Sequence, residues 1–307
     1  MTLPPAIKGQ IAAALGERFG SGVRISGASS VSGGCIHRAL RVDTSVGPIF
    51  AKWNTGEAGE AFGTEARALA ALLRATRDTG LVAVPEVYGF RDGDGSGDGW
   101  IAMEYLPPST PAGDHWTGLG EGLAALHAWN EGALGFGWPE ENRIGSLRQP
   151  NGWRDDWPGF WRDHRLLPQI RAAFDEGGLG APDRAWTDAV LEATETVLAS
   201  AAPERPGLLH GDLWSGNVHA GPTGPVLVDP AAYYGHGEVD LAMAELFGGF
   251  PREFFEAYQA VRPLPPGWSE HRRPLYQLYY LLVHLRLFGP SYYSGTRSAA
   301  RAALNAL

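Results

Sequence analysis

Short apolar runs separated by polar turns dominate the first hundred residues and predict β-strands. Apolar runs bounded by Gly, Pro, Asp and Ser are typical of strands, because a helix of comparable burial needs a longer segment. One stretch differs, since its apolar positions recur at helical spacing and predict an amphipathic helix. The expected strands are residues 23–28, 35–42, 49–53, 84–90 and 100–105, and the expected helix is residues 60–73.

Helical spacing dominates the remainder of the chain, apart from one hairpin expected over residues 218–228. The pattern predicts an α+β fold. A small antiparallel-sheet lobe with one helix, residues 1–105, would precede a larger, mainly helical lobe, residues 106–307. The residues with helical spacing are Leu119, Leu123 and Leu126, then Trp153, Trp157 and Trp161, then Trp186, Val190, Leu191, Thr194, Val197 and Leu198.

Composition and charge narrow the class of protein. The chain has 307 residues, 44% of them hydrophobic, which is enough to bury one large or two moderate cores. A net charge of −9 without a basic stripe argues against nucleic acid as a partner. Residues 275–288 are apolar but too short and too interrupted to cross a bilayer, and we identify no signal peptide. With Cys35 as its single cysteine, the chain is expected to be a cytoplasmic protein without a membrane partner.

The most informative chemistry lies at residues 210–217, followed twelve residues after Asn217 by Asp229. Kinase-like phosphotransferases use an aspartate, an asparagine five residues later and a second aspartate after a hairpin. Asp212 is the candidate base that accepts the proton of an attacking hydroxyl. Asn217 and Asp229 offer the oxygen ligands that Mg²⁺ prefers, with ATP as the phosphate donor. Taken alone, the first segment is equally compatible with a polar turn, and Asp229 with a strand-end carboxylate.

Lys52 lies in an otherwise apolar strand, where a charge is costly unless it is paired or functional. Glu65 lies in the helix that follows, one turn before Leu69. A strand lysine and a helix glutamate in this order form the ion pair that directs the lysine towards the phosphates of ATP. Glu60 competes for this function, and a solvated helix face is the other interpretation of Glu65. We predict a Lys52–Glu65 pair.

Two further segments are candidates for nucleotide contact. A small Gly-containing turn can bring backbone N–H groups close to phosphates, although most such turns only connect strands. The end of the last strand of the sheet is where backbone groups of an interlobe linker bind the adenine edge. The candidate residues are Ser32, Gly33, Gly34 and Cys35 in the turn, and Met103, Glu104 and Tyr105 at the strand end.

Other residues near the motif have both structural and binding interpretations. His210 is expected to brace the loop rather than act as a second base, and Asp240 either caps a helix or braces the loop. Trp214 is either an apolar wall for a sugar or part of the core. Trp153 belongs either to a packing stripe or to the helical insert in which related kinases build the acceptor site. Glu238 is either a solvated carboxylate or a group that attracts a cationic amine.

With these residues in order, the chain resembles the aminoglycoside and choline kinase branch of the protein-kinase-like fold. It is more closely similar to the fructosamine (ketosamine) kinase family, from about residue 32 to residue 293. The resemblance implies a bilobal kinase-like fold, ATP and Mg²⁺ as cofactors, and His236 with Glu238 near the substrate. The matching segments are residues 142–146, 149–153, 209–217, 229–236, 238–243, 246–250 and 275–279.

The same resemblance implies phosphorylation of the 3-hydroxyl of a ketosamine, the Amadori product of a free metabolite or of a protein amine. In this family the 3-phosphate eliminates and releases the amine, which is a deglycation step. The sequence departs from the family pattern in two places: His37 with Arg38 follows the Gly-containing turn, and Gly237 stands where the family usually carries arginine.

Three alternatives remain open from the residues. The nearest is a kinase for another small amino alcohol, such as an aminoglycoside or choline. A non-catalytic nucleotide-binding protein is disfavoured by the complete catalytic set. A metal-dependent hydrolase built on His210 and Asp212 is disfavoured because the nine histidines include no H-x-H or H-E-x-x-H pattern. For Cys35, a small buried residue is the expected interpretation and a redox-sensitive thiol the alternative.

Overall fold

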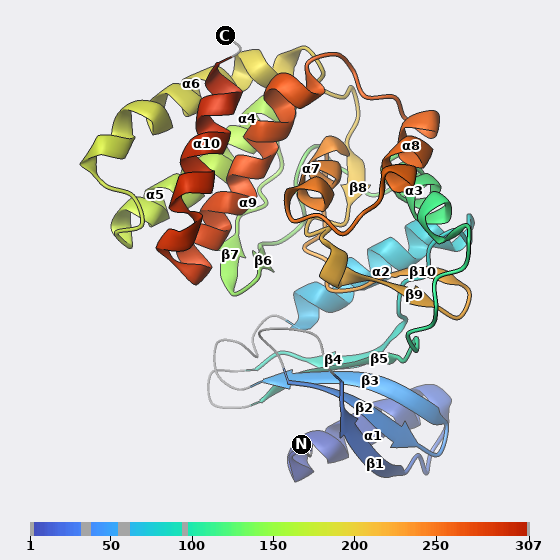
Figure 1. Ribbon diagram of the computed structural model, residues 1–307. Coiled ribbons are helices and arrows are strands. Elements are labelled where there is room, and N and C mark those ends of the chain that lie inside the picture. The colour runs from blue at the N-terminus through green and yellow to red at the C-terminus, as the bar shows by residue number, and fades with distance from the viewer. Residues whose placement is uncertain (1–2, 32–37, 55–61, 94–97, 306–307) are drawn as a thin grey trace. The chain divides into compact units, whose positions relative to one another are not determined.

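The computed structural model describes residues 3–31, 38–54, 62–93 and 98–305 (Figure 1). The chain forms two compact units, one from residues 1–112 and 218–230 and the other from residues 113–217 and 231–307. The first unit therefore extends past the boundary expected near Leu106 and also takes in the hairpin that the sequence placed in the C-terminal lobe. Each unit is therefore formed by two separate segments of the chain, whereas the sequence pattern predicted one continuous segment for each lobe.

The first unit is built on a five-stranded antiparallel sheet with the strand order β1-β2-β3-β5-β4. All five predicted strands are present. β4 begins later than expected because Ala83 pairs with Val226 of the hairpin and Pro85 has no N–H to donate. The strands are β1 (Ile25–Ser30), β2 (Arg38–Thr44), β3 (Gly47–Asn54), β4 (Val87–Arg91) and β5 (Gly99–Glu104).

Two helices, α1 (Pro5–Phe19) and α2 (Phe62–Arg77), lie on opposite faces of this sheet (Figure 1). Only α2 was predicted. α1 packs Ile7, Ile11 and Leu15 onto the core formed by one face of the sheet. Their spacing of four residues, together with Pro5 in the first turn, was the signal that could have identified this helix.

The hairpin of β9 (Val218–Gly221) and β10 (Gly224–Leu227) has the position and turn that the sequence predicted. Its contacts explain why it belongs to the first unit. His219 Nε2 lies 3.1 Å from the carbonyl oxygen of Leu106, and the hydroxyl of Ser109 donates to the carbonyl of Gly221 at 2.6 Å. The segment that follows β5 is therefore hydrogen-bonded to the hairpin.

The second unit is mainly helical, with two small two-stranded sheets. α3 packs closely on α8, because a Cβ on Gly120 would lie 2.9 Å from that of Ala257. No helix in the described part of the chain is long and apolar enough to cross a membrane. The helices are α3 (His115–Leu126), α4 (Trp157–Trp161), α5 (Leu167–Asp175), α6 (Arg184–Ala199), α7 (Glu238–Leu246), α8 (Arg252–Val261), α9 (Arg273–Phe288) and α10 (Tyr293–Leu304). The small sheets pair β6 (Asn142–Ile144) with β7 (Leu147–Gln149) and β8 (Gly207–Leu209) with β11 (Tyr233–Gly235).

The predicted helical stripe of three tryptophans is wrong at its first member. α4 begins only at Trp157, since Asp156 caps it by accepting a hydrogen bond from the backbone of Gly159, and Pro158 occupies the first turn. Trp153 precedes the helix and packs against Tyr234, with ring centroids 6.1 Å apart. The helical spacing of the three tryptophans was misleading, because the residues that start the helix, Asp156 and Pro158, lie between Trp153 and Trp161.

Candidate active site

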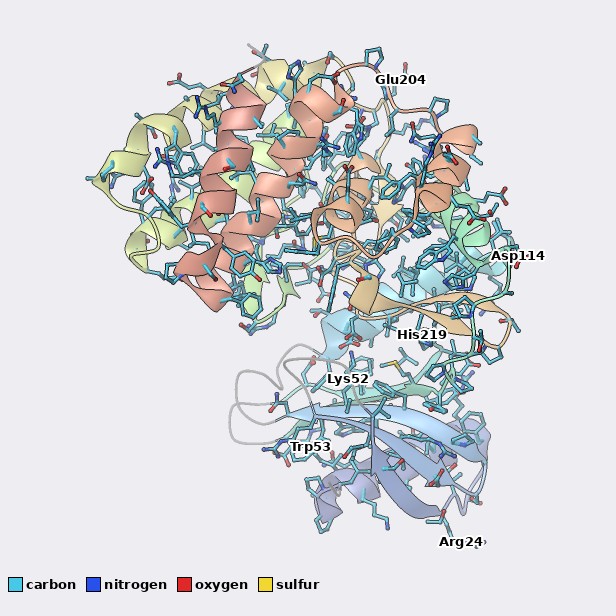
Figure 2. All side chains as sticks on the ribbon, in the orientation of Figure 1. Arg24, Lys52, Trp53, Asp114, Glu204 and His219 are labelled. Carbon is cyan, nitrogen blue, oxygen red and sulfur yellow. The ribbon has the colours of Figure 1, made fainter. Side chains whose placement is uncertain are left out.

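Strand alternation places Lys52 on the face of the sheet that α2 covers. Its neighbours in β3, Ala51 and Trp53, belong to the core on the α1 side, so the side chain of Lys52 points the other way (Figure 2). There its Nζ lies 2.8 Å from Oε1 of Glu65 and forms a second ion pair with Asp229, which follows β10. The predicted Lys52–Glu65 pair is therefore formed, and the candidate metal ligand Asp229 meets the same cation.

Two carboxylates share the ammonium group of Lys52 in this cluster. Burial lowers the pKa of Lys52, but Asp229 and Glu65 outweigh it and hold that pKa above its ordinary value. Burial raises the pKa of Glu65, which Lys52 counteracts. The chain has only two lysines, Lys8 and Lys52, although arginine is frequent. A compact ammonium group that acts as a point charge is thus placed at this position.

Asp229 is the one non-glycine residue of the described chain with a positive φ, 55°. This left-handed conformation costs an L-residue about 1–2 kcal/mol. It re-aims the Asp229 side chain, which is 39% exposed although its partner Lys52 is buried. A strained, partly open carboxylate beside a buried cation is the arrangement expected of a ligand-binding group rather than of a core ion pair.

In the second unit, Asp212 and Asn217 are held together by a short loop. The carbonyl of Asp212 accepts the backbone N–H of Trp214, and the carbonyl of Trp214 accepts that of Asn217. The Asn217 side chain donates from Nδ2 to the backbone carbonyl of Asp212 at 2.9 Å and to its Oδ2 at 3.3 Å. The predicted base and the predicted metal ligand are therefore direct neighbours.

Asp240, in the first turn of α7, holds this loop through hydrogen bonds to its backbone. Its two carboxylate oxygens accept the backbone N–H groups of His210 at 2.7 Å and Gly211 at 2.8 Å, and His127 Nε2 lies 3.0 Å from Oδ2. Burial would raise the pKa of Asp240, but the hydrogen bonds from His127 and from Gly211 prevail and lower it. Of the two interpretations of Asp240, the contacts show the brace, since the residue before α7 is Gly237.

His210 is completely buried, and its Nδ1 accepts the backbone N–H of Asp212 at 3.3 Å. This is the contact expected of a bracing residue. The adjacent Gly211 has a φ of 82°, and a Cβ there would collide with the carbonyl of Ala231. The hydroxyl of Tyr280 donates to the carbonyl of Gly211 at 2.8 Å, so α9 holds the loop from another side.

Buried amides support the segment after Asp229, a function that was not predicted from the sequence. Asn142 donates to the carbonyl of Ala232, and Gln149 is hydrogen-bonded to Asn142 and to Tyr279. Arg165, fully buried, stacks its guanidinium 3.9 Å from the ring of Tyr233. Asn142, Gln149, Tyr233 and Tyr279 lie in segments that carry the family resemblance, but residue type and spacing alone did not indicate that they support this segment.

Trp214 is 38% exposed, and its ring lies against Gly216, where any Cβ would overlap it. Of its two interpretations, packing inside the core does not fit this exposure. A second group of aromatic rings gathers around the C-terminal part of α9, where His284 lies one turn after Tyr280. It is partly exposed and was not anticipated from the sequence. Its members are Phe247, His284, Phe288 and Tyr292, with ring centroids 4.6–6.0 Å apart.

His236 and Glu238 lie together but in a different place from Trp214. Glu238 is buried, and both its oxygens accept hydrogen bonds from Arg272 at 2.7 and 2.8 Å. Although burial would raise the pKa of Glu238, the bonds from Arg272 and His236 lower it. His236 Nδ1 lies 3.2 Å from the hydroxyl of Tyr276. These contacts are those of a structural ion pair and its neighbour.

The predicted nucleotide contacts are only partly described. Ser32, Gly33, Gly34 and Cys35 lie outside the described residues, as do His37 and Glu60. At the end of β5, Met103 is buried, Glu104 donates its N–H to the carbonyl of Glu86, and Tyr105 lies beneath the guanidinium of Arg41. Whether the strand end binds adenine stays a prediction.

The donor groups fit magnesium better than a softer metal. Asn217 presents Nδ2 to Asp212, so its Oδ1 is directed away from that residue, and Asp229 supplies a carboxylate. Hard oxygen ligands of this kind suit Mg²⁺. The described residues contain no cluster of three His, Cys, Asp or Glu that would hold a metal without further ligands.

Comparisons with known proteins identify the class and then the family. The structure is similar to aminoglycoside phosphotransferase APH(4)-Ia, with a TM-score of 0.62, 17% identity, and coverage of 97% of this chain and 99% of that one. This likeness confirms the kinase-like α+β fold. The fructosamine kinase family model matches residues 7–306, and the chain belongs to that family.

Individual relatives agree with this assignment. A probable ketoamine kinase of Synechocystis is 39% identical over 94% of both chains. The chloroplastic protein-ribulosamine 3-kinase of Oryza sativa is 38% identical over 94% of this chain and 84% of its own. A crystal structure of a fructosamine-3-kinase candidate from Thermobifida fusca has a TM-score of 0.83 and 35% identity, and covers 96% of this chain and 98% of its own.

Proposed function

We propose that this protein transfers the γ-phosphate of ATP to the 3-hydroxyl of ketosamines, formed on free metabolites or on protein amines. The observation that carries the phosphotransfer is the cluster in which Lys52 is held by Glu65 and shared with Asp229. A ketosamine acceptor is supported by membership of the fructosamine kinase family and by the ribulosamine 3-kinase relative. We also propose a cytoplasmic location, in keeping with the single cysteine.

The residues divide the work between positioning and charge. Lys52 neutralises phosphate charge while Glu65 keeps its ammonium group in place. Asn217 and Asp229 would hold magnesium, which would supply charge neutralisation at the phosphates. Asp212 accepts the hydrogen bond of the attacking hydroxyl and takes its proton as the new bond to phosphorus forms. Because Asp212 must be ionised for this step, it needs no raised pKa.

Bracing keeps these groups in register. Asp240 and His210 fix the backbone on both sides of Gly211, so the carboxylate of Asp212 is positioned before substrate arrives. Preorganised geometry of this kind is a large part of what a kinase contributes, since the phosphoryl transfer itself needs little covalent chemistry from the protein.

For the acceptor, we propose that the exposed ring of Trp214 packs against the sugar or its amine substituent. His236, Glu238 and Trp153 were also candidates. Glu238 is engaged by Arg272 and Trp153 packs on Tyr234, so we rank Trp214 above them.

The decisive experiment measures ADP release with Mg-ATP and fructoselysine, beside choline and an aminoglycoside. Turnover that depends on fructoselysine and disappears in Asp212→Asn supports both the chemistry and the acceptor. We expect Asp212→Asn to lose at least a hundredfold in kcat, since general base and positioning effects are of this order.

Other outcomes have distinct meanings. Turnover with choline or the aminoglycoside alone retains the kinase and rejects the ketosamine. Binding of ATP without turnover on any acceptor contradicts the proposal and favours a non-catalytic nucleotide-binding protein. A nuclear magnetic resonance spectrum of the phosphorylated product identifies the hydroxyl that reacted.

A further inference from the structure

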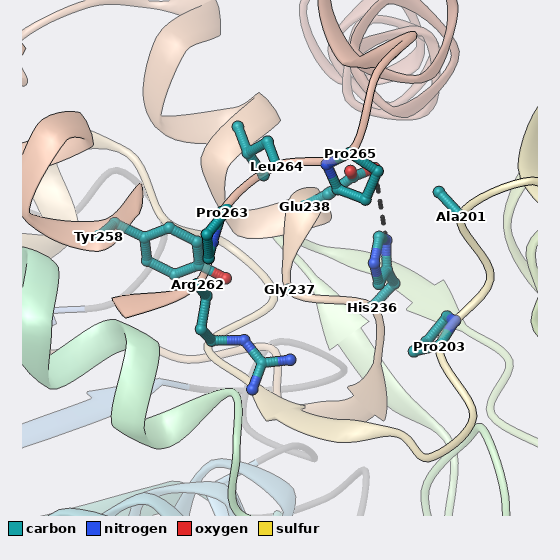
Figure 3. A pocket seen from close by; sticks show the side chains of 10 residues that line it. All are labelled: Ala201, Pro203, His236, Gly237, Glu238, Tyr258, Arg262, Pro263, Leu264 and Pro265. Atoms are coloured by element: carbon teal, nitrogen blue, oxygen red, sulfur yellow. Dashed lines mark ion pairs between the residues drawn. The ribbon is translucent and has the colours of Figure 1, made fainter. Parts of the chain in front are cut away.

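A separate pocket of about 320 Å³ lies in the second unit (Figure 3). Neither Asp212, Asn217 nor Trp214 contributes to its wall. Its volume falls at the lower end of the range in which proteins bind small molecules. The lining combines apolar and polar residues: Ala201, Pro203, His236, Gly237, Glu238, Tyr258, Arg262, Pro263, Leu264 and Pro265.

Arg262 is the group in this pocket whose charge is not neutralised. The other charged lining residue, Glu238, is already held at both oxygens by Arg272. Among the residues drawn in Figure 3, the only ion pair joins His236 to Glu238. No carboxylate in the described ranges of the chain forms an ion pair with Arg262, which is half-buried. A partly desolvated guanidinium without a counter-charge favours an anionic ligand.

The wall behind Arg262 connects to the catalytic loop. The hydroxyl of Tyr258 lies 2.9 Å from Nδ1 of His127, and Nε2 of His127 lies 3.0 Å from Asp240. Burial lowers the pKa of His127, so its ring is neutral. Because ionised Asp240 can only accept, the ring proton is on Nε2 and Tyr258 donates to Nδ1. A series of hydrogen bonds therefore runs from Tyr258 in the pocket through His127 and Asp240 to the backbone amides of His210 and Gly211.

Gly237 makes this arrangement possible. A Cβ at position 237 would collide with the His127 ring and lie 2.7 Å from the hydroxyl of Tyr258. Any side chain there would therefore displace the Tyr258–His127 hydrogen bond and fill part of the pocket. The absence of a side chain at position 237, noted from the sequence as a departure from the family, thus has a structural consequence.

We propose that this pocket binds a small phosphate- or carboxylate-bearing metabolite through Arg262, and that binding tightens the catalytic loop through Tyr258, His127 and Asp240. The apolar wall of prolines and Leu264 would contact the carbon skeleton of the ligand. The pocket is distinct from the groups that serve ATP and the acceptor, so its occupant would act as a regulator.

Calorimetric titration of the full chain tests the binding step, with inorganic phosphate, glucose 6-phosphate and citrate as probes. We expect at least one probe to bind the parent, and its dissociation constant to rise at least tenfold in Arg262→Gln. Ala201→Asp, which adds a negative charge to the same pocket, should weaken the same probe. Arg171→Gln is the matched control, because Arg171 is an exposed arginine of the same unit that does not line the pocket.

Phosphate and citrate distinguish the two sources of the anionic group. If no probe binds the parent at millimolar concentration, or if Arg262→Gln and Ala201→Asp bind as the parent does, the pocket is not an anion site. Neither result depends on kinase activity, so failure here is separable from failure of the proposed function.

Hydrogen exchange of residues 208–217 tests the connection to the loop. With the probe bound, the amides of His210 and Gly211 should exchange at least twofold more slowly in the parent and in Arg171→Gln. Tyr258→Phe removes the hydroxyl that donates to His127 and that also interacts with Arg262. At a probe concentration that saturates this variant, the protection should be absent. Unchanged exchange in the parent, or equal protection in Tyr258→Phe, would overturn the proposed path.

Discussion

Two buried ionic clusters in this chain use similar groups but differ in charge balance and access. In the first unit, Lys52 faces Glu65 and Asp229, and the Asp229 side chain is 39% exposed. In the second unit, Arg272 meets only Glu238, both side chains are 2% exposed, and two backbone carbonyls complete the guanidinium's hydrogen bonds. In the first cluster one carboxylate side chain reaches solvent, whereas in the second both side chains are almost completely buried.

This difference separates a group prepared for ligands from a group that holds the fold. A partly exposed carboxylate such as that of Asp229 is accessible to a cation, whereas a pair buried inside the protein is not. Burial alone does not distinguish the two, because Lys52 and Arg272 are both buried. What distinguishes them is the number of counter-charges and whether one of them can be reached.

The largest expected effect is on stability, from Arg272→Met. The change removes the guanidinium from buried Glu238 and leaves His236 as its remaining ion-pair partner. Breaking a buried pair in this way costs about 3–5 kcal/mol. Urea unfolding should show this loss, and the double variant Arg272→Met/Glu238→Gln should recover part of it because no buried charge remains. A large loss of acceptor turnover with stability unchanged would instead assign Glu238 to substrate binding and break the contrast.

Lys52→Met should act on turnover instead. Removing a preorganised positive charge from the phosphates typically costs about 10²–10³ in kcat. The matched control is Lys8→Met, since Lys8 is the other lysine of the chain and lies exposed on α1. Steady-state kinetics and thermal unfolding should show a much greater loss of turnover than of stability. The contrast fails if Lys52→Met unfolds as readily as Arg272→Met.

A smaller effect, on the binding of the acceptor, is expected from Gly216→Ala. This variant applies the comparison of exposed with buried groups to the side chain of Trp214. The new methyl group would displace the Trp214 ring from its place on Gly216. If that ring contacts the acceptor, the acceptor KM should rise roughly tenfold with little change in the KM for ATP. Gly9→Ala on α1, where a Cβ meets nothing within 4 Å, is the control. Equal KM values in both variants would return Trp214 to a packing role.

The smallest effect concerns pH and His127. Because its folded-state pKa is lowered from 6.5 by burial, the unfolded chain takes up a proton first as the pH falls. Stability should therefore decline below about pH 6.5, by at most ~1.4 kcal/mol per pH unit for this group. Asp240, whose pKa is also lowered, contributes only at more acidic pH.

His127→Gln keeps a donor for Asp240 and an acceptor for Tyr258 but cannot titrate. The free energy of unfolding measured in urea at pH 7.5 and pH 5.5 should differ less in this variant than in the parent. His164 and His284, whose pKa values are lowered mainly by burial, leave a residual slope. An identical slope in both proteins would show that the His127 ring is not held neutral.

The sequence by itself determined the five strands, the hairpin and the order of Lys52, Glu65, Asp212, Asn217 and Asp229. These features follow from local periodicity and from short motifs whose spacing is dictated by the chemistry. They can therefore be predicted without knowledge of the tertiary structure. The predicted ion pair of Lys52 with Glu65 was accessible for the same reason. The spacing of Ile7, Ile11 and Leu15 also indicates α1, although this helix was not predicted.

Only the tertiary structure decided which polar residues meet across long stretches of chain. The brace of Asp240 by His127, the Arg272–Glu238 pair and the pocket beside Gly237 join segments far apart in sequence. The hairpin's place with the N-terminal sheet rests on Ala83, Leu106 and Ser109. Such contacts produce no periodic pattern in the sequence. The partner of a buried polar group is determined by packing and charge compensation in three dimensions rather than by its neighbours along the chain.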